Sequence, residues 1–242
     1  MVTKEKTQVM EGSKYDVQGG NMWNKYDVKL QMTGRFAASL PRTREDIKAM
    51  LEHRAPVKPP ANYISLEQLE QEVVEKVGAV SSPSFVSEEE EEIQYGWATF
   101  CRDDQGLYYE GRCIRGHLKD CANQLQVFLK TKGLKAKVAN KVYVETDKIY
   151  LDRMQPDGTE LRYVQVMTRK GPRSAPKWID YCEKPVLEFR LKVLDDGVIG
   201  RDILAAIFDY GSVHGLGQER SQGWGRYTWE MREVAEKTEA EE

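Results

Sequence analysis

The 242-residue sequence predicts an α+β fold, because strand-like and helix-like segments follow one another in a recognisable order. Alternating apolar side chains predict strands, and apolar side chains at helical spacing predict helices. The strands are expected at 26–33, 142–144, 186–194 and 224–231, and the helices at 116–133 and 201–210, ended by Gly133 and Gly211. The order strand, helix, strand, strand, helix, strand is typical of a ferredoxin-like (RRM-like) βαββαβ core, with both helices on one sheet face.

Other segments precede or interrupt this core. Residues 1–25 are polar and contain glycine, which indicates a flexible arm. Thr43 begins a short predicted helix, and Ser65 with Gln68 forms the capping box of a second helix that ends at Gly78. Serines and five consecutive glutamates then indicate a linker. We assign 34–92 to an inserted helical lobe with an acidic linker, 26–33 and 93–232 to the core, and 233–242 to an acidic tail.

Two insertions are expected within the core region. The turn residues 103–106 lie between the aromatic-rich segments 95–101 and 107–114, a pattern typical of a β-hairpin. A further strand at 161–168 is followed by the basic connection 169–181, which leads to the strand at 186–194. The core is therefore predicted to carry hairpin insertions as well as the helical lobe.

The charge of the chain is distributed unevenly. The formal net charge of -3 and the pI near 5.8 argue against a nucleic-acid partner, because Lys and Arg drive phosphate binding. Residues 94–232, however, contain 23 Lys and Arg against 18 Asp and Glu. The acidic run 88–92 and the acidic tail are interpreted as solvated segments. The alternative is an acidic segment that covers a basic groove until nucleic acid displaces it.

Several protein classes are not indicated. The four cysteines form no C-x-x-C pair and have no histidine at ligand spacing, so we expect no metal site, disulfide framework or cofactor. The beginning of the chain lacks the apolar core of a signal peptide, and no apolar run approaches membrane-spanning length. We therefore expect a cytoplasmic protein, in a prokaryotic cell or a phage-infected host, with no membrane partner.

The most informative segment is the glycine-rich loop 215–227, between the second core helix and the last strand. Its glycines permit positive φ values and close approach to a ligand, its arginines suit phosphate, and its aromatic rings suit base stacking. The alternative is a flexible connection whose aromatic side chains join the core. The candidate binding residues are Gly215, Gly217, Arg220, Gly223, Trp224, Gly225, Arg226 and Tyr227.

Two further segments are candidates for phosphate binding. Segment 111–119 ends a predicted strand and opens the first core helix, where free N–H groups attract anions. Its candidates are Arg112, Arg115, Gly116, His117 and Lys119, although Gly116 could simply permit a turn beside solvated charges. Segment 169–181 offers Arg169, Lys170, Arg173, Lys177 and Trp178 as a charged groove wall, or alternatively as a solvated hairpin tip.

Two of these motifs, in this order, resemble those of the RAMP superfamily of CRISPR-associated proteins. Ile114 to Lys119 is similar to its hydrophobic-basic-glycine motif, and 215–227 is similar to its C-terminal glycine-rich loop. The resemblance covers 26–33 and 94–232, and is strongest to the subunit that coats guide RNA. It implies binding of RNA on a ferredoxin-like core, with 169–181 as a thumb, and self-association or other effector-complex subunits as partners. A phage or mobile-element relative that coats its own RNA or single-stranded DNA is the alternative.

Two other function classes stay open. Some RAMP relatives are metal-independent endoribonucleases, so His117 and His214 are candidate catalytic residues. A helix start disfavours positive charge and would lower the pKa of His117. Asp46 is similar in position to the acid with which some backbone subunits cleave target RNA, or is simply a helix first-turn acid. The competing class is a phage structural or assembly protein, in which the glycine-rich loop closes a contact between subunits.

Overall fold

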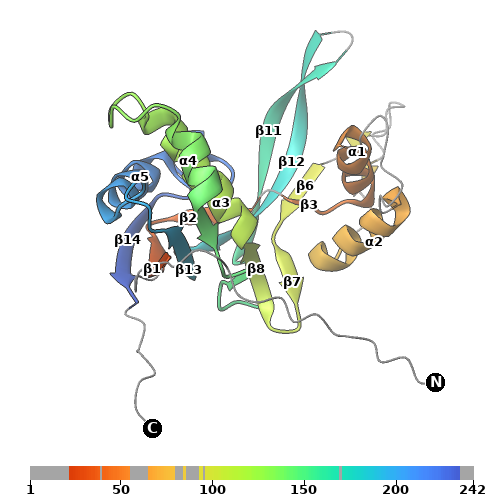
Figure 1. Cartoon of the computed structure of the whole chain (residues 1–242). Coiled ribbons are helices and arrows are strands. Elements are labelled where there is room, and N and C mark those ends of the chain that lie inside the picture. Colours follow the sequence, from red (N-terminus) through yellow and green to blue (C-terminus); the bar gives the residue numbers. More distant parts are fainter. Residues whose placement is uncertain are drawn as a thin grey trace, which may run out of the picture.

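The computed structural model describes residues 22–38, 40–54, 65–79, 84–85, 93–94, 96–168 and 171–234, and it confirms the α+β class (Figure 1). The acidic run 88–92, residues 1–21 of the predicted arm and almost all of the acidic tail lie outside the described residues. Among the helices that are described, none is long and apolar enough to cross a membrane.

A four-stranded antiparallel sheet joins strands from both ends of the chain. Its members are β1 (Trp23–Met32), β9 (Val142–Val144), β13 (Val186–Leu194) and β14 (Tyr227–Glu233). They lie in the order β14-β1-β13-β9. If the four strands are numbered one to four along the chain, their order across the sheet is fourth, first, third, second.

Side-chain alternation explains how this sheet packs. Along β1, Val28 and Leu30 are buried whereas Asp27 and Lys29 are exposed, because successive side chains point to opposite faces. The apolar face packs against helices α3 (Gly111–Leu125) and α5 (Arg201–His214) in one hydrophobic core. The polar face lies away from these helices.

The first core helix begins and ends earlier than predicted. Strand β8 (Gly106–Glu110) ends at Glu110, and α3 begins at once at Gly111, where a Cβ would overlap the carbonyl oxygen of Thr146. Gly133 does not end this helix but is the left-handed N-cap of a separate helix, α4 (Leu134–Lys141). Phe128 lies within the predicted helix 116–133, but it is 79% exposed in the turn between the two helices.

The second core helix, in contrast, is longer than predicted. Gly211 does not stop α5, which continues to His214 and is capped by Gly215. The missing side chain at Gly211 is used for packing instead, because a Cβ there would overlap the Oη atom of Tyr227 and crowd the ring of His117.

A second sheet carries a long hairpin that extends away from the body, with α1 (Arg44–Arg54) and α2 (Leu66–Val77) on one side of it and α3, α4 and α5 on the other (Figure 1). The hairpin consists of β11 (Gly158–Thr168) and β12 (Gly171–Glu183). Strands β6 (Gly96–Thr99), β3 (Leu40–Pro41) and β2 (Arg35–Ala37) complete the sheet. Segment 169–181 is therefore mostly strand, which corrects the expectation of a loop.

The prolines of β12 are tolerated because of the pairing on its second edge. That edge pairs with β6 only at 177–179 and with β2 only at 181–183. Pro172 and Pro176 precede these paired stretches, so each has a neighbouring strand on one edge only, and prolines in sheets are found at such edges.

Smaller elements complete the described structure. The hairpin predicted around 103–106 is confirmed as β7 (Cys101–Asp103) and β8, with β10 (Lys148–Tyr150) beside β8. The capping box is also confirmed, since Ser65 and Gln68 exchange hydrogen bonds and Gly78 is left-handed. The remaining elements are β4 (Ser84–Phe85), β5 (Ile93–Gln94) and the short helix η1 (Arg220–Gln222).

Candidate nucleic-acid interface

The glycine-rich loop folds back onto β2 and onto itself. Gly215, Gly217, Gly223 and Gly225 all have positive φ values. A Cβ at Gly217 would overlap the carbonyl oxygen of Ala37, and one at Gly225 would overlap that of Leu216. The expectation that these glycines bring the backbone close to a ligand is therefore corrected: at Gly217 and Gly225 they permit close packing within the protein.

The aromatic rings of this loop are buried. Trp224 is 8% exposed and packs edge-on against Tyr181, with the guanidinium groups of Arg35 and Arg162 over its ring at 5.4 and 5.3 Å. Tyr227 is 3% exposed and faces the helix layer. The expectation that both rings are free to stack on bases is wrong, because Trp224 packs against the second sheet and Tyr227 belongs to the core between the four-stranded sheet and the helices.

The basic segment of α3 lies within the helix and not at its start. Since α3 begins at Gly111, residues 115–117 belong to its second turn, and the predicted anion site formed by their free N–H groups is wrong. Arg115 donates to the carbonyl oxygen of Ala139 and lies over the ring of Tyr143. Arg112 is exposed and paired with Glu110.

Gly116 leaves a bare patch on the exposed face of α3. A Cβ at this position would meet no atom within 4 Å. Helical spacing places Arg112 and Lys119 on one side of Gly116, and His117 and Asp120 on its other side. The helix surface at Gly116 is thus free of side chains, between the basic pair Arg112 and Lys119 and the pair His117 and Asp120.

The structure brings together the two histidines that the sequence identified separately. The rings of His117 and His214 are stacked with their centroids 6.3 Å apart. The Nε2 atom of His214 lies 3.1 Å from Oδ2 of Asp120, and Nη1 of Arg220 lies 3.1 Å from the same oxygen. Arg220 also approaches His214, with 2.6 Å between Nη1 and Nε2. Asp120 was not predicted from the sequence, because a single acidic residue within a predicted helix has no distinctive sequence pattern.

These residues line a surface depression between α3 and the glycine-rich loop, which we call the α3–loop depression. One part has a volume of about 190 Å³ and is lined by Tyr109, Cys113, Gly116, His117, Asp120, Leu216, Gly217 and Arg220. A second part of about 590 Å³ is lined by His214, Gly217, Gln218, Glu219, Arg220 and Ser221. Since Gly217 and Arg220 line both parts, the two parts adjoin.

The charge states of the depression follow from burial and contacts. Burial lowers the pKa of His117 to about 4, and the nearby His214 and Arg220 lower it further, so this ring is neutral at pH 7. For Asp120, burial acts to raise the pKa, but hydrogen bonds from Arg220 and His214 outweigh it and lower the pKa below its usual value. The depression therefore presents a carboxylate beside a guanidinium. No group of three His, Cys, Asp or Glu side chains suited to a metal occurs in the described parts of the chain.

The base of the long hairpin adjoins the same loop. Lys177 on β12 donates from Nζ to Oε1 of Gln218 at 3.1 Å, and its pKa is lowered mainly by burial. Trp178 is half-buried, whereas Arg226 in the loop is exposed. Arg169 and Lys170, and the side chain of Arg173, lie outside the described residues.

One exposed aromatic residue was not recognised in the sequence. Tyr163 on β11 is 71% exposed and follows Arg162, which covers the ring of Trp224. Successive side chains of β11 point to opposite faces of the hairpin, and this alternation could have indicated that the ring of Tyr163 points into solvent. The hairpin thus offers an accessible ring that the loop does not.

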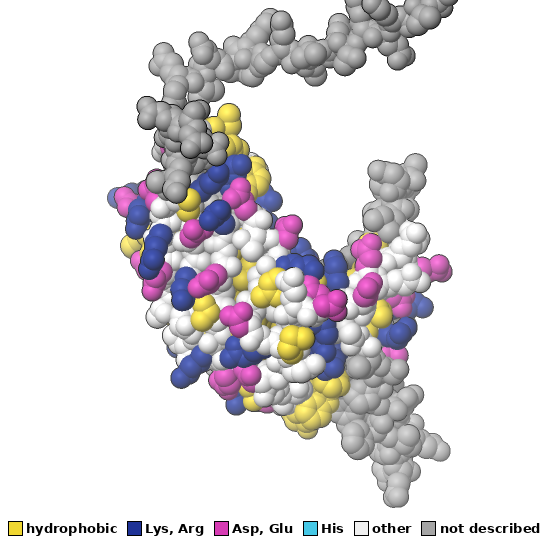
Figure 2. Space-filling model, turned by 90° about the horizontal axis from the view of Figure 1, so that it is seen from below, with side chains coloured by type: hydrophobic (Ala, Val, Ile, Leu, Met, Phe, Trp, Pro, Cys, Tyr) yellow, Lys and Arg dark blue, Asp and Glu magenta, His cyan; other side chains and the backbone are white. Residues whose placement is uncertain are grey.

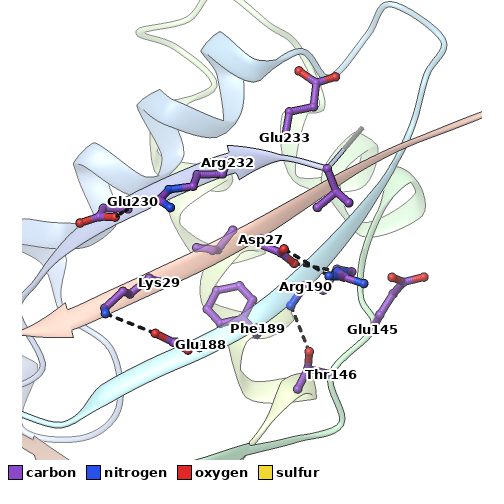
Figure 3. Close-up of a pocket in the computed structure, with 12 residues that line it drawn as sticks. Asp27, Lys29, Glu145, Thr146, Glu188, Phe189, Arg190, Glu230, Arg232 and Glu233 are labelled. Carbon is purple, nitrogen blue, oxygen red and sulfur yellow. Dashed lines mark hydrogen bonds and ion pairs between the residues drawn. The ribbon is translucent and has the colours of Figure 1, made fainter. Parts of the chain in front are cut away.

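The polar face of the four-stranded sheet carries a hollow of about 900 Å³ (Figure 3). Its charges are largely paired with one another, as in Asp27 with Arg190 and Lys29 with Glu188. Five acidic and three basic residues line it: Asp27, Glu145, Glu188, Glu230, Glu233, Lys29, Arg190 and Arg232. RRM domains stack bases on aromatic residues of this face, so a net acidic, ion-paired face does not suit nucleic acid.

One side of the molecule carries no broad surface of a single charge. Figure 2 shows basic and acidic side chains interspersed over the described residues on the side seen from below. On this side, a nucleic-acid site therefore has to be identified from local geometry and not from a broad basic patch.

No protein-family model matches the sequence, and none of the curated proteins matches it. Among solved structures, the chain is similar to a chain in the cryo-EM structure of the Type III-B Cmr-beta bound to cognate target RNA. The two are 13% identical with a TM-score of 0.45, and the similarity covers 88% of this chain. The chain spans 61% of the length of that chain. A similarity of this degree does not define a shared function.

Proposed function

We propose that the four-stranded sheet with α3 and α5 is a ferredoxin-like core of the RAMP type. The strand order β14-β1-β13-β9 and the placement of both helices on one face support this proposal. The two motifs that resemble RAMP proteins also meet at one surface depression. On this proposal 26–33 and 93–232 form the core, 34–92 is an inserted lobe, and 233–242 is an acidic tail.

We further propose that the protein binds single-stranded nucleic acid, specifically RNA, across the bare patch at Gly116 and into the α3–loop depression. The observation that carries this proposal is the meeting of Gly116 with Gly217 and Arg220, which are distant in sequence. A missing side chain allows a sugar–phosphate backbone to lie close to the helix, and a guanidinium binds phosphate well. Arg112 and Lys119, one helical turn from Gly116, supply further positive charge near this path, and Arg226 is exposed in the same loop as Arg220.

We propose that the long hairpin forms a second part of the nucleic-acid-binding surface. Its base contacts the glycine-rich loop through Lys177 and Gln218, and through Arg162 over Trp224. A strand in the depression would therefore pass beside the base of the hairpin, and by crossing the edge strand β11 it would reach the exposed ring of Tyr163 on the opposite hairpin face. Stacking on such rings is tolerant of sequence, as the coating of a strand requires. The partners proposed with RNA are further copies of this chain or other subunits of an effector complex.

The experiment that tests this function is a titration of the protein against labelled single-stranded RNA and DNA of roughly 20 to 40 nucleotides, followed by fluorescence anisotropy. We expect binding whose affinity falls linearly with salt concentration on logarithmic axes, because phosphate contacts release counterions. Absence of binding at low salt would contradict the proposal, and would favour the structural or assembly class instead.

Metal-independent RNA cleavage is a second candidate, favoured by one observation: the rings of His117 and His214 lie 6.3 Å apart. The burial of His117 and its contact with Tyr227 weigh against it, since a general base must reach the ribose hydroxyl. The test is RNA cleavage in EDTA by the wild-type protein and by a His117→Ala, His214→Ala double variant. Cleavage that the double variant loses would support this function, and unchanged cleavage would exclude these residues.

A further inference from the structure

Asp120 is an unexpected residue in a surface proposed to bind phosphate. Its side chain is 42% exposed and lines the α3–loop depression beside Arg220. A carboxylate repels phosphate, so its exposed position beside Arg220 favours a ligand group other than phosphate at Asp120. A carboxylate can only accept hydrogen bonds, and the ligand group must therefore be a donor.

The chemistry of nucleic-acid backbones leaves one such donor. Phosphate oxygens and the sugar ring oxygen only accept hydrogen bonds, and the backbone of DNA has no donor between its ends. The backbone of RNA has one donor for each nucleotide, the ribose 2′-hydroxyl. A carboxylate is also the group that binds ribose hydroxyls in dinucleotide-binding proteins.

We infer that Asp120 accepts a hydrogen bond from a ribose 2′-hydroxyl while Arg220 binds the adjacent phosphate, which makes the site selective for RNA over DNA. This inference rests on the proposed function and names the residue that determines its specificity. The 2′-hydroxyl and the 3′-phosphate are attached to neighbouring carbons of one ribose. A carboxylate and a guanidinium 3.1 Å apart match that adjacency.

The shape of the depression fits a sugar–phosphate unit. Gly116, one helical turn before Asp120, and Gly217, across from it, contribute no side chains to the walls. The volume of about 190 Å³ next to Asp120 is below the roughly 300 Å³ at which small-molecule pockets begin. A whole nucleotide with its base exceeds this smaller part, so the base would lie outside it.

The test compares three strands of one sequence: RNA, DNA, and RNA with 2′-fluoro sugars, which keeps an RNA-like sugar shape but cannot donate at the 2′ position. The proteins are the wild type, Asp120→Ala, Asp120→Asn, and Glu188→Ala as a control. Glu188→Ala also removes one acidic partner of an ion pair, but on the polar sheet face. Circular dichroism verifies that each variant is folded.

We expect the wild type and Glu188→Ala to bind RNA at least about tenfold more tightly than either other strand, the effect of a hydrogen bond to a charged group. Asp120→Ala should lose this preference while binding DNA as well as the wild type or better, and Asp120→Asn should reduce the preference. Equal binding of all three strands by the wild type would overturn the inference. So would an equal loss of RNA and DNA affinity in Asp120→Ala, which would mean that Asp120 only positions Arg220. Failure to bind any strand would instead contradict the proposed function and the inference with it.

Discussion

The Nε2 atom of His117 lies 2.9 Å from the Oη atom of Tyr227, and this buried contact joins α3 to β14 beside the α3–loop depression. It is possible only because Gly211 on α5 has no side chain to occupy the space between the helices and the strand. The floor of the depression is thus fixed by three elements that are distant in the chain. Arg220 and Asp120 lie at its surface.

Protein stability is expected to fall as the pH decreases from about 6.5 towards about 4. Burial lowers the pKa of His117 to about 4 in the folded protein, so the unfolded chain binds a proton in this range that the folded protein does not. The loss is on the order of 3 kcal/mol once both pKa values are passed. Urea unfolding at several pH values measures it, and a His117→Gln variant should lack this part of the pH dependence. An identical pH profile in that variant would refute the assignment.

Arg220→Ala is expected to weaken RNA binding and to reduce the slope of log affinity against log salt by about 0.7, the value for one phosphate contact on a single strand. Arg190→Ala is the matched control, because Arg190 is also exposed and ion-paired but lies on the polar sheet face. Anisotropy titrations at several salt concentrations measure both effects. If the two variants change the slope equally, Arg220 does not contact phosphate.

Trp224→Ala is expected to act on folding and not selectively on binding. The ring is 8% exposed and packs between Tyr181, Arg35 and Arg162, so its loss leaves a cavity at the base of the hairpin. We expect a loss of about 3 kcal/mol in unfolding free energy, measured by chemical denaturation, and a smaller loss for Trp224→Phe. A Trp224→Ala protein of normal stability that no longer binds RNA would show that the ring is a binding residue after all.

Tyr163→Ala is expected to weaken RNA binding by about 1 to 3 kcal/mol, because it removes an exposed ring that can stack on a base. Tyr163→Phe should bind normally, since the ring is retained. Phe128→Ala is the control: it removes a similarly exposed ring, 79% against 71%, from the turn after α3. Equal affinities of all three variants, measured by anisotropy, would remove the hairpin from the binding surface.

The sequence predicted features that depend on neighbours in the chain. The capping box at Ser65 and Gln68 was predicted because its two hydrogen bonds join residues three apart. The boundaries of β13 were predicted because one face of the strand is buried and the other exposed. Strands β1, β9 and β14 and helices α3 and α5 were likewise expected from this periodicity, whereas α4 was not.

Features that depend on tertiary packing were missed. The burial of Trp224 follows from contacts with a hairpin more than forty residues earlier in the chain, which no local pattern reports. Gly116 was taken as the helix start because glycine usually interrupts helices, whereas here it lies in the second turn of α3. His117 and Asp120 lie on α3 and His214 lies on α5, so their meeting depends on how these two helices pack side by side.

The most direct measurement of the central claim is the RNA affinity of two variants at Gly116. A Cβ there meets no atom within 4 Å, so Gly116→Ala should raise the unfolding free energy by about 0.5 to 1 kcal/mol and leave binding nearly unchanged. Gly116→Leu should also fold, but its side chain would occupy the proposed path of the RNA backbone and reduce affinity at least about tenfold. A folded Gly116→Leu protein that binds RNA as tightly as the wild type would contradict the proposed binding surface.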